Sequence, residues 1–275
     1  MRKQSTEMLC LLLLLCGTME RAFAQDDVPS QDIKIGNDEH KRYFLIGPQK
    51  EQKAPDDGYG LVVILPGGTG DAQFHPFVKR IFKNALPAGY VVAQPVAVKW
   101  TNVQKIVWPT GTLQADKMQF STEEFVADVI KDVKSKQKID PKRVFTLSWS
   151  SGGPAGYAIS LANKEVTGSF VAMSVFKPIQ LGPLTNAKGH AYYIYHSAQD
   201  KVCPIKMAEQ AAKDLARNGA KTEIVKYSGG HGWRGDLYSD IRKGIEWLEK
   251  NHADPTDSHK GNGVTKATKA VKSSK

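Results

Sequence analysis

Stretches of apolar residues alternate with amphipathic stretches along most of the chain, which has 275 residues. Mostly apolar runs rich in Val, Ile, Tyr and Phe predict buried strands, because these residues favour the pleated conformation and a doubly covered sheet needs apolar side chains throughout. We predict strands at residues 41–46, 59–65, 90–98, 144–147, 168–175, 191–195 and 222–227. The first of these is expected to be antiparallel and at the edge of the sheet.

Apolar residues spaced three and four positions apart predict helices between these strands. The helices are expected at residues 74–86, 121–138, 155–162, 205–218 and 237–250. The second helix has the clearest start, because Ser121 and Glu124 have the spacing of a capping box. Strands that alternate with helices predict an α/β fold, with a mostly parallel central sheet and helices on both faces, in a single domain. Residues 101–120 match no element and are a candidate pocket wall.

The first 24 residues have the pattern of a secretory signal peptide. A charged start at residues 1–3 precedes an apolar run at residues 9–16 and an A-x-A motif at residues 22–24. The apolar run is too short to span a bilayer, so we predict cleavage after Ala24 and no stable membrane insertion. The predicted location is therefore secreted or periplasmic, in a bacterium. Lipid attachment at Cys16 is the weaker alternative, because a bulky leucine precedes it.

Cysteine and charge usage divide the remaining chain into a domain and a tail. Two of the three cysteines lie in the predicted signal peptide, which leaves Cys203 and no internal disulfide. Residues 25–253 are long enough for one α/β domain held together by its core. Residues 254–275 contain five Lys, two Asp and no aromatic residue, which predicts a solvated basic tail, with adhesion to acidic polymers as the alternative. The net charge is +10, but no aromatic residues are interleaved with these lysines, so no nucleic-acid partner is expected.

The stretch at residues 144–162 has the order strand, sharp turn, helix, with Ser150 at the turn. This order is typical of a nucleophile elbow, in which a strained tip residue aims its side chain out of the sheet. Residues two before and two after the tip must be small, because strand and helix nearly touch there. Ser148 and Gly152 occupy these positions, so the motif is S-x-S-x-G instead of the usual G-x-S-x-G. A plain Ser/Gly-rich turn is the alternative interpretation.

Candidates for a general base and its orienting acid follow two later strands. Sites in parallel sheets form at the carboxyl ends of the strands. Asp200 lies in the loop after residues 191–195, and His231 lies in a glycine-rich loop after residues 222–227. A nucleophilic serine needs such a base, and the base needs an acid. The chain order Ser150, Asp200, His231 is the order found in the α/β-hydrolase fold.

Other residues with reactive side chains are assigned structural roles. His196 is a rival base, because it ends its strand four residues before Asp200, but we expect it to be structural or pocket-lining. Cys203 is expected to be a small packing residue. The seven histidines show no spacing such as H-E-x-x-H, and no metal site is predicted. No phosphate loop or dinucleotide motif follows a strand.

Two backbone N–H groups are needed to hold a developing oxyanion. One is expected from Ser151, directly after the nucleophile. The other is expected from the loop at residues 66–70, with the sequence PGGTG, where glycines let the backbone approach a substrate closely. Gly68 is the first choice for this donor and Thr69 is the second.

Four stretches, LVVILPGGTGD, IDPKRVFTLSWSSGG, HSAQDKVCP and GGHGW, give the chain a resemblance to α/β-hydrolases. It most resembles secreted, single-domain serine esterases akin to polyhydroxybutyrate depolymerases and feruloyl or acetylxylan esterases. The resemblance implies Ser150 as nucleophile, Asp200 as acid and His231 as base. It also implies Gly68 and Ser151 as oxyanion donors, and no cofactor.

The chain departs from that family at three positions. Pro66 stands where the family usually has His before the oxyanion glycines, and Ser148 and Ser197 stand where it usually has Gly. These changes affect the oxyanion loop and the elbow, while all three triad members are present.

The predicted function is hydrolysis of carboxylic esters through an acyl-enzyme, with a small-molecule or polymeric ester as substrate. The residues point to no particular acyl or alcohol part and to no oligomeric state. A serine peptidase of the same fold is one alternative, although such enzymes usually carry extra domains. An inactive hydrolase-fold binding protein is the other. The candidate substrate-binding residues, with core packing as the alternative, are Trp108, Trp149 and Trp233.

Overall fold

The computed structural model describes residues 28–49 and 53–252, so the predicted signal peptide and basic tail lie outside the described residues. Its centre is an eight-stranded sheet with the order β1-β2-β4-β3-β5-β6-β7-β8. The strands are β1 Ser30–Lys34, β2 Arg42–Ile46, β3 Tyr59–Leu65, β4 Tyr90–Pro95, β5 Ile139–Trp149, β6 Gly168–Ala172, β7 Ala191–Ser197 and β8 Lys221–Tyr227. The two pairs β1–β2 and β2–β4 are antiparallel, and all other neighbours are parallel.

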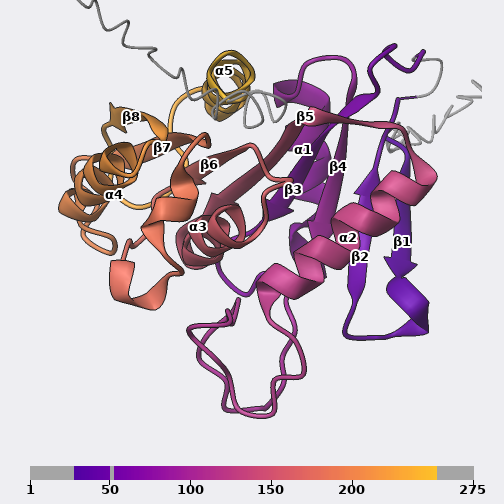
Figure 1. Cartoon of the computed structure of the whole chain (residues 1–275), viewed down its shortest axis with the longest axis horizontal. Helices are drawn as coiled ribbons and strands as arrows, with labels where there is room; N and C mark the ends of the chain where they lie inside the picture. The colour runs from indigo at the N-terminus through magenta and orange to yellow at the C-terminus, as the bar shows by residue number, and fades with distance from the viewer. Residues whose placement is uncertain (1–27, 50–52, 253–275) are drawn as a thin grey trace, which may run out of the picture.

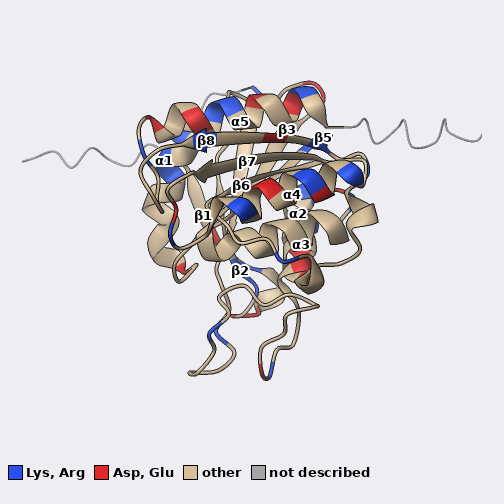
Figure 2. Ribbon diagram, turned by 90° about the vertical axis from the view of Figure 1, so that its left-hand side faces the viewer, with Lys and Arg blue, Asp and Glu red and all other residues tan. Residues whose placement is uncertain are grey.

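Helices cover both faces of this sheet (Figures 1 and 2). The α-helices of the described chain are α1 His75–Ala85, α2 Thr122–Lys136, α3 Gly153–Ala162, α4 Ile205–Arg217 and α5 Leu237–Asn251. Helices α1 and α5 bury their apolar stripes on one face, and α2, α3 and α4 bury theirs on the other. The short 3₁₀ turns are η1 Ile35–Asn37, η2 Ala72–Phe74, η3 Ser150–Gly152, η4 Pro178–Gln180 and η5 Leu184–Ala187. The predicted α/β architecture is therefore confirmed.

Local sequence signals account for most of these elements. Every residue of β3 is buried, as its continuous apolar run predicts for a strand covered on both faces. The capping box of α2 is present, because the Ser121 hydroxyl accepts from the Glu124 N–H and the Glu124 carboxylate accepts from the Ser121 N–H. Helix α4 ends just before Gly219, whose φ of +85° carries the chain out of the helix.

The edge of the sheet differs from the prediction. Strand β2 is antiparallel, as expected, but β1 covers its outer side, so the prediction that residues 41–46 form the edge is wrong. Strand β1 has no apolar alternation that would reveal it, because four of its five residues are exposed. Its pairing with β2 is supported by the bidentate ion pair between Arg42 and Asp32.

The parallel strands bring the loops that follow β3, β5, β7 and β8 to one edge of the sheet. A long excursion, residues 96–121, joins β4 to α2 and extends from the body of the protein in both views (Figures 1 and 2). Within residues 28–49 and 53–252, no helix is both long enough and apolar enough to cross a membrane.

Candidate active site

The turn after β5 holds Ser150 in a left-handed backbone conformation, with a φ of 51°. This conformation is rare for a residue with a side chain, and it is the strained geometry of a nucleophile elbow. Strand and helix meet so closely here that a Cβ atom on Gly152 would overlap the carbonyl oxygen of Leu65. The chain therefore needs glycine two residues after Ser150, as the elbow pattern predicts.

The serine two residues before Ser150 is accommodated by a second glycine. Ser148 is fully buried, and a Cβ atom placed on Gly156 of α3 would overlap the Ser148 Oγ atom. The missing side chain of Gly156 therefore leaves the space that the Ser148 hydroxyl occupies. This pairing explains how the elbow tolerates S-x-S-x-G where glycine usually stands first.

We expect Gly156→Ala to destabilise the protein by about 1–3 kcal/mol, because overpacking forces strand and helix apart. The double variant Ser148→Gly/Gly156→Ala should recover most of that loss, since it moves the missing side chain from one partner to the other. Denaturant unfolding measures both, with Gly182→Ala as control because a Cβ atom there meets nothing within 4 Å. Equal stability of Gly156→Ala and wild type would contradict the pairing.

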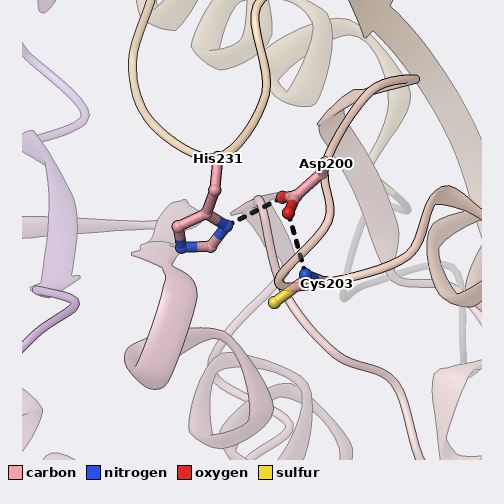
Figure 3. Close-up of side chains that lie close together, drawn as sticks. All are labelled: Asp200, Cys203 and His231. Carbon is pink, nitrogen blue, oxygen red and sulfur yellow. Dashed lines mark hydrogen bonds and ion pairs between the residues drawn. The ribbon is translucent and has the colours of Figure 1, made fainter.

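Three side chains from separate strand ends form a continuous hydrogen-bonded chain. Ser150 Oγ lies 2.9 Å from His231 Nε2, and His231 Nδ1 lies 2.8 Å from Asp200 Oδ2. Figure 3 shows the His231 ring directed at the Asp200 carboxylate. An ionised carboxylate only accepts, so Nδ1 carries the proton and Nε2 of the neutral ring accepts from the Ser150 hydroxyl. This is the tautomer that a general base beside a serine needs.

The environment of Asp200 keeps its carboxylate ionised. Burial alone would raise its pKa, but the N–H groups of Cys203 and Val202 each donate to Oδ1 at 2.8 Å, and His231 donates to Oδ2. These hydrogen bonds outweigh burial, and the net result is a pKa of Asp200 below its ordinary value. The carboxylate is thus charged at neutral pH and able to stabilise an imidazolium.

The loop that carries His231 is held in place on several sides. Gly229, Gly230 and Gly232 all have positive φ values, so the loop follows a path that other residues rarely adopt. Two of its N–H groups donate to the segment before Asp200, Gly229 N–H to Gln199 Oε1 (2.9 Å) and Gly230 N–H to Ser197 Oγ (3.0 Å). On its other side, Gly232 N–H donates to Met173 Sδ (3.0 Å), and the Gly232 carbonyl accepts from Tyr227 O–H (2.8 Å). Ser197 and Gln199 belong to the segment before Asp200, so the loops that carry Asp200 and His231 are joined directly.

The rival base His196 lies on the far side of the acid. It is 1% exposed, and its Nε2 atom donates to the Cys203 carbonyl at 2.7 Å and lies 3.5 Å from Asp200 Oδ2. The structure therefore brings His231, and not His196, to Ser150. The position of His196 supports a structural role in the acid loop.

One group of potential metal ligands coincides with this site. Asp200, Cys203 and His231 place one ligand atom each within 4.8 Å of one another (Figure 3). Both the Asp200 carboxylate and His231 Nδ1 are already engaged in hydrogen bonds. Burial also raises the pKa of the Cys203 thiol to about 11, so it is protonated at neutral pH and a weak ligand. The donor set fits a hydrogen-bonded acid and base better than a metal centre.

The loop after β3 lies against the elbow, where an oxyanion donor is required. A Cβ atom on Gly67 would lie 2.9 Å from Ser150 Cβ, so only a glycine lets the loop approach Ser150 this closely. Gly68 has a φ of +60°, its carbonyl accepts from Ser151 Oγ at 2.9 Å, and its N–H has no acceptor among the described residues. The carbonyl of Pro66 accepts from Trp108 Nε1 at 2.9 Å. These bonds fix the orientation of the Gly68 peptide beside Ser150.

The three candidate pocket tryptophans occupy different places. Trp108 is 3% exposed and lines a cavity beside Ser151. Trp149 and Trp233 are not among the residues lining that cavity, and they contact each other edge to face with ring centres 5.8 Å apart. Trp149 also packs against the two phenylalanines of the α1 region, so it belongs to the core.

No protein-family model and no curated protein matches the sequence. Solved structures do match. A truncated carbohydrate esterase from gut microbiota superposes with a TM-score of 0.61 at 13% identity, over 83% of this chain and 99% of that one. MGS-M1, an α/β-hydrolase enzyme from a deep-sea metagenome library, superposes with a TM-score of 0.56 at 14% identity, over 82% of this chain and 98% of that one. Thermogutta terrifontis esterase 2 phosphorylated by paraoxon superposes with a TM-score of 0.56 at 15% identity, over 80% of this chain and 91% of that one. The likeness is one of fold, and the chain has the α/β-hydrolase fold.

Proposed function

We propose that this protein is a serine hydrolase that cleaves carboxylic esters, with Ser150 as nucleophile, His231 as general base and Asp200 as orienting acid. The hydrogen-bonded chain from Ser150 through His231 to Asp200 is the observation that carries the proposal. The strained elbow supports it, because a positive φ at Ser150 is costly and serves to expose a side chain. Esterases among the structural neighbours agree with this reaction class.

The mechanism follows from the positions of these groups. His231 Nε2 takes the proton of Ser150 as the hydroxyl attacks the ester carbonyl, and Asp200 stabilises the imidazolium that forms. The N–H groups of Gly68 and Ser151 hold the negative charge on the carbonyl oxygen. His231 then donates the proton to the leaving alcohol. A water molecule repeats the cycle on the acyl-enzyme and releases the acid.

The proposal extends to the location of the enzyme. We propose that residues 1–24 direct export and are removed, and that residues 25–253 form the catalytic domain. An export signal fits a substrate met outside the cytoplasm, whether a small ester or an ester polymer. Mass spectrometry of the secreted protein should find Gln25 at its N-terminus.

A fluorophosphonate probe tests the proposed nucleophile. Such probes phosphonylate activated serines, so peptide mapping should find the adduct on Ser150 and none on Ser148 or Ser151, whose hydroxyls do not contact His231. Labelling should disappear in Ser150→Ala. Folded wild-type protein that takes up no probe would instead favour the alternative of an inactive hydrolase-fold binding protein, and labelling at a different serine would reassign the site.

A further inference from the structure

A cavity of about 170 Å³ is lined by Ser151, the residue directly after the proposed nucleophile, and the mechanism above makes no use of this cavity. Its walls come from the excursion between β4 and α2, from the start of α3 and from the segment after β6. The lining residues include Val107, Trp108, Leu113, Ser151, Pro154 and Tyr157. A cavity of about 150 Å³ with apolar walls takes up a benzene molecule, so this one is the size of a single six-membered ring.

Two lysines give this apolar cavity a positive rim. Lys105 and Lys177 both belong to its lining, which contains no carboxylate. Both side chains are exposed, and neither forms an ion pair with any described residue. The two cavity lysines are therefore available to an anionic ligand.

Tyr157, in the same wall, has a hydroxyl with no partner among the described residues. Tyr157 is 1% exposed, yet its phenol makes no hydrogen bond to any described residue. Burial raises the pKa of Tyr157 well above its usual range, so the phenol remains a neutral donor. The hydroxyl is therefore free to donate to an acceptor on a ligand in the cavity.

The two loops that form the rim are tied together. The Thr112 hydroxyl donates to the Gln180 carbonyl at 2.6 Å, which joins the excursion to the segment after β6. Trp108 anchors the excursion to the oxyanion loop through the Pro66 carbonyl. These two hydrogen bonds hold the cavity wall in a fixed position relative to Ser150.

We propose that this cavity binds a ring-sized part of the ester substrate that carries a carboxylate, with Lys105 and Lys177 as the residues that select the negative charge. This substrate class rests on the proposed function. The ring would lie against the apolar wall, and Tyr157 would donate to an oxygen of the bound group. The carboxylate can belong to the acid or to the alcohol part of the ester, and matched substrates distinguish the two.

Two pairs of small esters test the selection. Monomethyl terephthalate and methyl benzoate differ by a carboxylate on the acid part, and 4-acetoxybenzoate and phenyl acetate differ by one on the alcohol part. Each kcat/KM is divided by the rate constant for hydroxide-catalysed hydrolysis. In one of the pairs we expect the normalised kcat/KM of the charged ester to be about fivefold higher than that of the neutral ester, mainly because its KM is lower. An effect of about fivefold is what two exposed ion pairs contribute. High salt should reduce the preference.

The variants identify the residues responsible. The double variant Lys105→Gln/Lys177→Gln should bring the charged-to-neutral ratio close to one. Lys164→Gln is the control, because Lys164 is exposed at the far end of α3 and changes the net charge without touching the cavity. A wild-type enzyme that shows no preference for the charged ester in either pair would overturn the inference, as would a double variant that keeps the preference.

Failure of the proposed function has a different signature. If none of the four esters is turned over, the esterase proposal fails, and the cavity is tested by binding alone. Benzoate and benzamide are then compared through the fluorescence of Trp108, which lines the cavity. Tighter binding of benzoate that is lost in the double lysine variant supports the cavity assignment, and equal or weaker binding overturns it.

Discussion

Ester turnover by the Ser150→Ala variant is expected to fall by a factor on the order of 10⁶, because removing a triad nucleophile leaves only the oxyanion donors and substrate binding. The fold should remain intact, since alanine fits the small space at the elbow and is no larger than serine. Steady-state kinetics on an activated aryl ester measures the loss, and circular dichroism with thermal unfolding checks the fold.

The neighbouring serine provides the matched comparison. Ser151→Ala removes the hydroxyl that donates to the Gly68 carbonyl but keeps the Ser151 N–H, so it loosens the oxyanion loop without removing a reacting group. We expect Ser151→Ala to be at least about a thousandfold more active than Ser150→Ala, because oxyanion-hole losses are smaller than loss of the nucleophile. The reverse order of activities would mean that the nucleophile has been misassigned.

Asp200→Asn is expected to lower kcat by on the order of 10⁴ while leaving the protein folded. Asparagine fills the same space and still accepts from the N–H groups of Val202 and Cys203 through its oxygen. Its amide N–H₂, however, favours a His231 ring with the proton on Nε2. That tautomer cannot accept the proton of Ser150, so the base is lost although the geometry is kept.

His196→Gln is the control for this experiment. His196 contacts the acid loop through the Cys203 carbonyl and does not reach Ser150, so its replacement should cost far less turnover than Asp200→Asn. Stopped-flow or burst kinetics separate acylation from deacylation in both variants. A His196→Gln variant as inactive as Asp200→Asn, with its fold intact, would show that both histidines take part in the reaction.

Hydrophobic pattern predicts most of this fold because the sheet is doubly covered. The central strand β3 is buried at every residue, and such runs stand out from any loop. The hydrophobic pattern does not reveal strand β1, because this outer strand gains its stability from pairing with β2 and buries little of its own surface. An exposed strand leaves no hydrophobic period in the sequence, so its position depends on the partner that it meets.

The candidate site was predictable to the extent that it depends on the order of strands. Ser150, Asp200 and His231 each follow a parallel strand, and topology alone brings the ends of these strands together. Packing between distant residues was not predictable. The Ser148 hydroxyl fills the space left by Gly156, and the Tyr157 hydroxyl has no partner among the described residues. Both features arise only when α3 packs on the sheet.

If the cavity binds substrate as proposed, residues 96–121 contribute to the choice of substrate and not to the chemical reaction. This segment supplies much of the cavity wall, yet none of the hydrogen-bonded chain at Ser150 comes from it. Two hydrogen bonds join it to the loop at residues 66–70: Trp108 Nε1 donates to the Pro66 carbonyl, and the Ala97 N–H donates to the Gly70 carbonyl. Changes in the length or sequence of this segment should therefore alter the cavity while leaving the hydrogen bonds among Ser150, His231 and Asp200 unchanged. We therefore expect homologous enzymes that share Ser150, His231 and Asp200 to differ in substrate specificity through changes in this segment.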